Sequence, residues 1–146
     1  MNSFSLWRLF TSDFMTATAS ILLLVFSVLT WMVIIEKIRL FSTAKRNKPT
    51  GTPDVAIKPF DKNLWFLAMV AYVAPFIGLF GTVWGVMDSF ASIGANQSVS
   101  IGVIAPGLAV ALGTTALGLI VAIPAAIAHQ VFSKKADDLY DSLGGK

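Results

Sequence analysis

The sequence has no cysteine, a single histidine and few charged residues. The absence of cysteine excludes disulfides and thiol-based metal or redox chemistry, and one histidine is too few for most histidine-built metal sites. No nucleophile–base pair, metal-ligand cluster or phosphate-binding loop is found in the sequence, so we expect neither an enzyme nor a bound cofactor or metal ion. The chain is instead apolar: 55% of its 146 residues are hydrophobic and 13% are charged, which is rare in a soluble domain.

Three apolar runs are long enough to cross about 30 Å of hydrocarbon as helices. They cover residues 16–35, 64–87 and 100–132. The last two runs contain no charged residue, and Asp88, which lies between them, is the only charged residue from 63 to 133. The first run is longer than the apolar core of a signal peptide, so we favour a membrane helix over that alternative. The third would form a helix of about 50 Å, so we expect it to tilt or to project into water. The sequence therefore predicts an all-α membrane protein with three transmembrane helices.

The basic residues predict the orientation of these helices. Seven of the eleven Lys and Arg residues lie between residues 36 and 62, three lie after residue 133, and one lies in the N-terminal arm. Because basic segments stay in the cytoplasm, the N-terminus is expected outside and the C-terminus inside, and the basic pI does not indicate nucleic-acid binding. We divide the chain into an interfacial arm (1–15), a first transmembrane helix (16–35), a short cytoplasmic linker (36–62), a helical pair (63–132) and a cytoplasmic tail (133–146). Within the linker, NKPTGTPDVAIKPFD is punctuated by proline, which is typical of a connecting segment.

Small residues predict where the helices pack, because they let helix backbones approach closely in lipid. Gly81 and Gly85 form a GxxxG pattern, and the third run carries two sets of small residues that recur every four positions. Two such ridges on one helix imply neighbours on two sides, so we expect a homo-oligomer, with tight packing inside a monomeric hairpin as the alternative. The glycines expected at helix contacts are Gly78, Gly81, Gly85, Gly107, Gly113 and Gly118. The prolines expected to bend their helices, because each removes a backbone hydrogen bond, are Pro75, Pro106 and Pro124.

Polar side chains inside the last two runs have two possible roles. Thr82 and Ser89 are seven residues apart and share one helical face, and Thr114 and Thr115 lie within APGLAVALGTTALGLIVAIP. A buried hydroxyl commonly bonds to its own helix, whereas hydroxyls on facing helices line a wet path or bind a polar group of another helix. The residues alone leave both roles open. Asp88, near the outer end of the second run, is expected to be interfacial and solvated.

Two stretches resemble the MotA/TolQ/ExbB proton-channel family. APFIGLFGTVWGVMDSF and IAPGLAVALGTTALGLIVAIPAAIA contain GLFGTVWG, APG and ALGLIVAIP in the family's order and spacing, and they cover about half of the chain. The first span, with SVLTWMVIIEKIRLF, looks more like TolQ than ExbB. The resemblance implies a pentamer in the bacterial inner membrane, which places the N-terminal arm in the periplasm, with a central pore lined by the second and third helices.

The resemblance also implies partners and site residues. Single-span helices like those of TolR or ExbD sit in the pore and carry an essential Asp, and proton flow drives work on the outer envelope through a TolA- or TonB-like partner. The family's pore threonines fall on Thr82 and Thr115, so these two hydroxyls are expected to face the pore, with Ser89 on the same face. Thr114 is expected at a helix interface. The family's small and proline positions match at Gly78, Gly81, Gly85, Pro106, Gly107, Gly118 and Pro124.

The sequence departs from the family at two points. The family motif PGIAEAL reads PGLAVAL here, so Val110 stands where the resemblance leads us to expect a glutamate, and valine cannot bind a proton or accept a hydrogen bond. Asp88 lies on another helix and is not an obvious substitute. The cytoplasmic segment, about 27 residues, is also much shorter than in the family. Both departures bear on proton coupling more than on the fold.

Three functions fit these observations. The first is a subunit of a TolQ/ExbB-type motor that is driven by the proton-motive force and energises outer-envelope transport or Tol-Pal envelope maintenance. The second is a non-conducting membrane scaffold that binds partner helices, which Val110 and the short linker favour. The third is an unrelated small transporter or channel. Proton conduction separates the first from the second, and a one-span partner with a membrane Asp separates both from the third.

Overall fold

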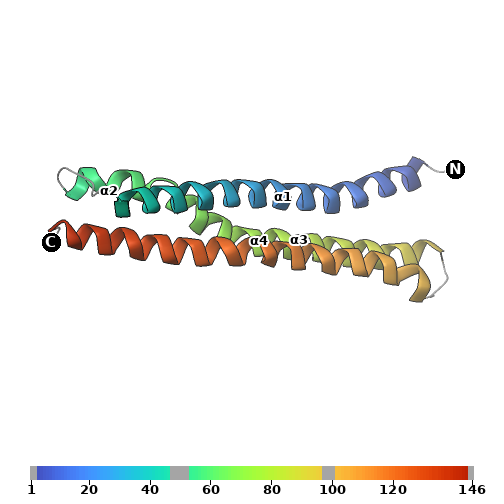
Figure 1. Ribbon diagram of the computed structural model, residues 1–146. Helices are drawn as coiled ribbons and strands as arrows, with labels where there is room; N and C mark the ends of the chain where they lie inside the picture. The colour runs from blue at the N-terminus through green and yellow to red at the C-terminus, as the bar shows by residue number, and fades with distance from the viewer. Residues whose placement is uncertain (1–2, 47–52, 97–100, 145–146) are drawn as a thin grey trace.

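The computed structural model describes residues 3–46, 53–96 and 101–144, and these ranges contain helices and no strand. Three long helices lie side by side along one axis, and a short helix lies at the end of the bundle where the fourth helix ends (Figure 1). In chain order the helices are α1 (Ser3–Arg46), α2 (Pro53–Asp61), α3 (Leu64–Asn96) and α4 (Ile101–Ser142). Helices α1 and α4 run in the same direction, and α3 runs against both (Figure 1).

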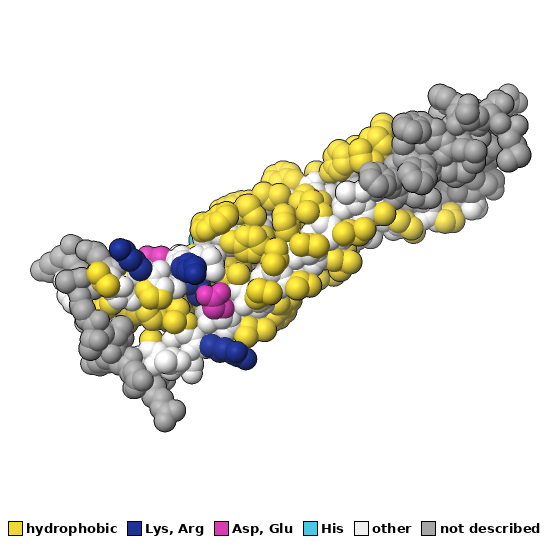
Figure 2. Space-filling model, turned by 90° about the horizontal axis from the view of Figure 1, so that it is seen from above, with side chains coloured by type: hydrophobic (Ala, Val, Ile, Leu, Met, Phe, Trp, Pro, Cys, Tyr) yellow, Lys and Arg dark blue, Asp and Glu magenta, His cyan; other side chains and the backbone are white. Residues whose placement is uncertain are grey.

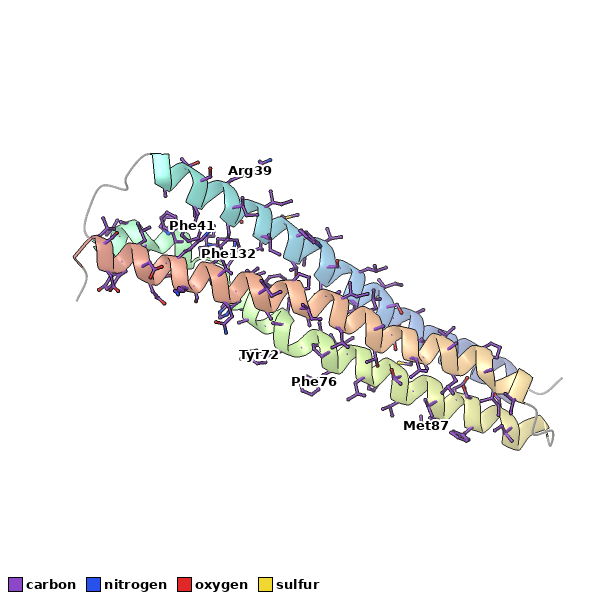
Figure 3. All side chains as sticks on the ribbon, turned by 60° about the horizontal axis from the view of Figure 1, so that its bottom comes forward. Arg39, Phe41, Tyr72, Phe76, Met87 and Phe132 are labelled. Carbon is purple, nitrogen blue, oxygen red and sulfur yellow. The ribbon has the colours of Figure 1, made fainter. Side chains whose placement is uncertain are left out.

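Three stretches are long and apolar enough to cross a membrane, namely Met15–Ala44, Val55–Ile93 and Ile104–Ser142. Hydrophobic side chains are exposed along the middle of the molecule, whereas the charged side chains in this view gather at one end (Figure 2). Tyr72, Phe76 and Met87 point away from the bundle, as side chains that face lipid do (Figure 3). The expected all-α fold with three membrane helices is confirmed. The division into arm, spans, linker and tail stays a prediction, and the side chains of the arm up to residue 14 lie outside those described.

Apolar side chains from all three long helices form the core. One cluster joins Leu23 of α1, Val70 and Ala74 of α3, and Val121 and Ala125 of α4. A second cluster lies nearer to α2 and contains Val33, Ile34, Leu64, Leu67, Ala128 and Phe132. The membrane-spanning middle of the chain is thus held by apolar side chains from all three long helices, and small ones such as Ala74 and Ala125 allow the close approach on which helix packing in lipid depends.

The connecting segment between the first two spans contains a helix that the sequence did not predict. Pro53 is the first residue of α2, a position where a missing N–H has no consequence for a helix. Ala56, Ile57 and Phe60 are buried, so their spacing gives α2 one apolar face. This spacing of apolar residues indicates a helix, but the prolines led us to expect a connecting segment instead. The helix also continues through Pro59, and the chain then turns at Asn63, whose φ of 66° is left-handed.

Lys37 of α1 binds the C-terminal end of α2. Its Nζ donates hydrogen bonds to the carbonyl oxygens of Phe60 (2.6 Å) and Pro59 (3.0 Å), and the side chain is fully buried. The last carbonyl groups of a helix have no partner inside the helix and carry its partial negative charge, so an ammonium group is well placed there. An aromatic contact supports the same junction, since Phe41 of α1 packs against Phe60 (4.8 Å between centroids) and stacks on Phe132 of α4 (5.7 Å) (Figure 3).

We predict that Lys37→Met destabilises the junction between α1 and α2. Hydrogen bonds to charged groups contribute about 1.5–3 kcal/mol each, so losing both is expected to lower the free energy of unfolding by roughly 3–6 kcal/mol in detergent. Thermal unfolding followed by circular dichroism measures the change. Lys62→Met is the matched control, because Lys62 is exposed at the same end of the molecule. Equal stability of the two variants would contradict the capping role of Lys37.

We predict that Thr30→Val stabilises the protein. Thr30 is 1% exposed, and its Oγ1 is the buried side-chain atom that lacks a hydrogen-bond partner within the described ranges. An unpaired buried hydroxyl is unfavourable by about 1–3 kcal/mol, and valine has the same shape, so the free energy of unfolding should rise by about 1 kcal/mol. Thr114→Val is the control and should lower it, because the Thr114 hydroxyl is bonded. A loss of stability in Thr30→Val would show that a bound water or another group pairs with this hydroxyl.

Candidate functional site

The backbones of α3 and α4 approach each other so closely at Gly78 and Gly118 that a side chain does not fit. A Cβ on Gly78 would lie 2.7 Å from the carbonyl oxygen of Thr114 and 3.0 Å from the Cα of Thr115. A Cβ on Gly118 would lie 2.7 Å from the carbonyl oxygen of Ala74. Real Cβ atoms do not approach backbone atoms this closely, so both positions require glycine. We call the line of contact between the two helices the α3–α4 seam.

The seam continues toward the end of the bundle opposite α2. A Cβ on Gly81 would lie 2.7 Å from the Oγ1 of Thr114, and one on Gly85 would lie 2.6 Å from the Cβ of Ala111. A Cβ on Gly107 would lie 2.8 Å from the Oγ of Ser89. Five of the six glycines expected at helix contacts therefore lie in the seam. Gly113 does not, because a Cβ built there meets no atom within 4 Å.

Three threonine hydroxyls converge where the helices are closest. Thr114, which is 4% exposed, lies within hydrogen-bond reach of the carbonyl oxygens of Ala111 (2.7 Å) and Gly78 (3.2 Å). The hydroxyl of Thr115 reaches the same Gly78 carbonyl at 3.2 Å. The hydroxyl of Thr82 crosses the seam to the Ala111 carbonyl at 2.9 Å and also contacts the hydroxyl of Thr115. Thr82 and Thr115 are half-buried, so this hydroxyl pair is partly open while Thr114 is enclosed.

These bonds bear on the two roles that the residues left open. All three hydroxyls lie within hydrogen-bond distance of a backbone carbonyl of the facing helix, namely Ala111 for Thr82 and Gly78 for Thr114 and Thr115. A hydroxyl can donate one hydrogen and accept others, so the half-buried Thr82 and Thr115 hydroxyls can also accept a hydrogen bond from a polar group of another helix. The hydroxyl pair is the arrangement in the seam that offers such a contact inside an otherwise apolar region.

Ser89 lies further along α3 and is bonded to its own helix. Its Oγ donates to the carbonyl oxygen of Gly85 at 2.8 Å, and the residue is 7% exposed.

The helices continue without a break through Pro75 in α3 and through Pro106 and Pro124 in α4. The extent to which these prolines bend the helices stays a prediction.

A cavity of about 430 Å³ lies between α1, α3 and α4 at the end of the seam. Its walls include Ser20 from α1, Asp88 and Ser89 from α3, and Val110 from α4. Among the described lining residues Asp88 is the titratable one, and Val110 is 61% exposed. Asp88 was not expected to be an obvious substitute for a glutamate at position 110 because it lies on another helix, but the antiparallel packing of α3 and α4 brings Asp88 and Val110 to one cavity. Within the described ranges no group of three His, Cys, Asp or Glu side chains could hold a metal ion.

Comparison with known proteins places the seam inside a matched region. The model of the MotA/TolQ/ExbB proton channel family matches residues 53–144, which include α2, α3 and α4. The chain is similar to the biopolymer transport protein ExbB of Salmonella typhimurium, with 44% identity over 79 residues, covering 54% of this chain and 32% of that protein. It is similar to the Tol-Pal system protein TolQ of Pseudomonas aeruginosa (47% over 79 residues, 54% and 34%) and to that of Haemophilus influenzae (41% over 88 residues, 60% and 39%). The match thus covers about a third of the length of these relatives.

We predict that Gly78→Ala and Gly113→Ala have opposite effects. A methyl group at Gly78 must push α3 away from the α4 backbone, so Gly78→Ala should lower the free energy of unfolding by about 1–3 kcal/mol. At Gly113 the methyl group would contact no other atom of this chain, and alanine favours a helix over glycine by up to about 1 kcal/mol. Thermal unfolding in detergent measures both, with Gly113→Ala as the control for the change of residue type. Similar stability of the two variants would contradict the close approach at Gly78.

Proposed function

The chain belongs to the MotA/TolQ/ExbB proton channel family, and from this premise we propose that it is an inner-membrane subunit of a TolQ/ExbB-type motor driven by the proton-motive force. The observation that carries this proposal is the pair of hydroxyls of Thr82 and Thr115, in contact across the seam of the two helices that the family model matches. Hydroxyl groups are the polar side chains available for a proton path at this point of the seam, because Asp88 is the only charged residue from position 63 to position 133.

The motor needs partners that the family resemblance implies. We propose that a single-span protein like TolR or ExbD places a carboxyl group against the Thr82 and Thr115 hydroxyls, and that a TolA- or TonB-like protein transmits the resulting motion to the outer envelope. Orientation follows from charge: the charged end of the bundle, which contains α2 and the end of α4, lies in the bacterial cytoplasm, and the opposite end lies in the periplasm (Figure 2).

A homo-oligomer, for which the family implies a pentamer, is supported by the face of α4 that the seam does not use. Thr114, Gly118 and Ala122 are buried against α3 and α1, whereas Ala105, Ala109 and Gly113 are exposed. The exposed ridge of small residues allows close approach of a helix from a neighbouring subunit. The prolines and the remaining glycines serve the packing of α3 and α4 in this proposal.

The second candidate function is a membrane scaffold that binds partner helices without coupling protons. Val110 favours it, because this side chain offers no proton-binding group where the resemblance leads us to expect a glutamate. The two candidates share the fold and the partners, so proton flux is the property that separates them.

We predict that Thr115→Val lowers proton flux into liposomes that contain this protein with a TolR/ExbD-like partner. Valine keeps the shape of threonine but removes the hydroxyl, and loss of one positioned proton donor or acceptor is expected to reduce flux by about tenfold or more. Thr115→Ser retains the hydroxyl and is the control that should keep most of the flux. Equal flux in all three proteins would contradict the role of the hydroxyl pair. Absence of flux in the unmodified protein, with flux in Val110→Glu, would favour the scaffold.

A further inference from the structure

The cavity between α1, α3 and α4 contains a carboxyl group that the proposed hydroxyl path does not use. Asp88 is half-buried in its wall, beside Ser89 and across from Val110. The lining also includes the hydroxyl of Ser20 on α1, which donates to the carbonyl of Thr16 at 2.9 Å. A volume of about 430 Å³ with polar groups on two helices is large enough and polar enough to hold several water molecules.

The cavity adjoins the α3–α4 seam at the contact of Gly85 with Ala111. Gly85 and Ala111 line its inner end, and the carbonyl oxygen of Ala111 accepts the hydrogen bond from Thr82 at 2.9 Å. Asp88 is six residues from Thr82, so along α3 the two lie about 9 Å apart. Along the helices the order is therefore the cavity with the carboxyl of Asp88, then Ala111, and then the hydroxyls of Thr82 and Thr115.

We propose that Asp88 is the proton-exchanging carboxyl group at the periplasmic end of the seam. Its carboxylate accepts a proton from a hydronium ion in the cavity and leaves a water molecule, and it then gives the proton to cavity water at the end lined by Gly85 and Ala111, where the cavity adjoins the seam. Val110 faces the same cavity without any such group, so the carboxyl stands on α3 and the opposite wall on α4 is apolar. This inference deepens the proposed function and rests on it, but the presence of a charged, hydrated cavity is a separate property with its own test.

The charge of the cavity can be measured with thiol reagents, because the chain has no cysteine of its own. Val110→Cys places one thiol in the cavity wall, and its rates with cationic trimethylammonioethyl methanethiosulfonate and anionic sulfonatoethyl methanethiosulfonate are compared. Relative to free cysteine, the cationic reagent should be favoured several-fold, and Asp88→Asn in the same background should remove this preference. Ser20→Cys, a nearly isosteric change on the α1 wall, is the second reporter if Val110→Cys does not fold.

Two results of the labelling would overturn the proposal. If neither thiol reacts, the cavity contains no accessible water. If the thiols react with a preference that Asp88→Asn does not change, the carboxylate does not act on the cavity. Neither result depends on proton flux, so the labelling remains informative if the proposed function fails.

The proton role is tested by moving the carboxyl group across the cavity. In liposomes with a TolR/ExbD-like partner, Asp88→Asn should reduce flux at least tenfold, and the double variant Asp88→Asn/Val110→Glu should restore it. Asp138→Asn, an exposed carboxylate at the other end of α4, is the control that should leave flux unchanged. Retained flux in Asp88→Asn, or failure of the double variant to restore it, would overturn the proposal. Flux in Val110→Glu but not in the unmodified chain would do the same, whereas no flux in either would refute the proposed function.

Discussion

The approach of α3 to α4 at Gly78 and Gly118 is the constraint on which the rest of the structure depends. Lipid provides no hydrophobic force that brings helices together, so the two helices must gain contact area through backbone proximity. Without side chains at these two positions, the carbonyl oxygens of Thr114 and Ala74 lie directly against the facing helix. At the same level the Gly78 carbonyl is within reach of the Thr114 and Thr115 hydroxyls of α4, so backbone contact and polar contact occur at the same part of the seam.

Packing and the candidate function thus use the same atoms. The Gly78 carbonyl receives the hydroxyl of Thr114, which is enclosed, and that of Thr115, which is half-buried. Thr82 extends the group by bonding to the Ala111 carbonyl. A wider separation of the helices would leave the Thr82 hydroxyl near its own helix alone, where Gly78 accepts it at 3.3 Å. The contact between the Thr82 and Thr115 hydroxyls is therefore a consequence of two glycines rather than an independent feature.

The parts of this arrangement that depend on one helix could be read from the sequence. Apolar length gave the three spans, and glycine spacing gave the face of α3 that carries Gly78, Gly81 and Gly85. What required the structure were relations between elements. The capping of α2 by Lys37 joins residues more than twenty positions apart, and periodicity does not encode which carbonyls an ammonium group reaches. The sequence showed the two ridges of small residues on α4. Only the packing shows that Thr114 and Gly118 are buried against the other helices, whereas Gly113 is exposed.

The cavity lined by Asp88 and Val110 is also a relation between helices that required the structure. It bears on whether the valine at position 110, where a glutamate was expected, leaves the protein without a carboxyl group for proton exchange. A proton path needs an ionisable group within a given volume, and the chemistry of a carboxyl group does not depend on which helix supplies it. Because α3 and α4 are antiparallel and close, residues that are 22 positions apart line the same cavity. The valine at position 110 thus means that the α4 wall of the cavity has no carboxyl group at this position. It does not mean that the cavity has none. Whether the cavity can exchange protons is therefore decided by whether it contains a charged carboxyl group, and not by which helix supplies that group.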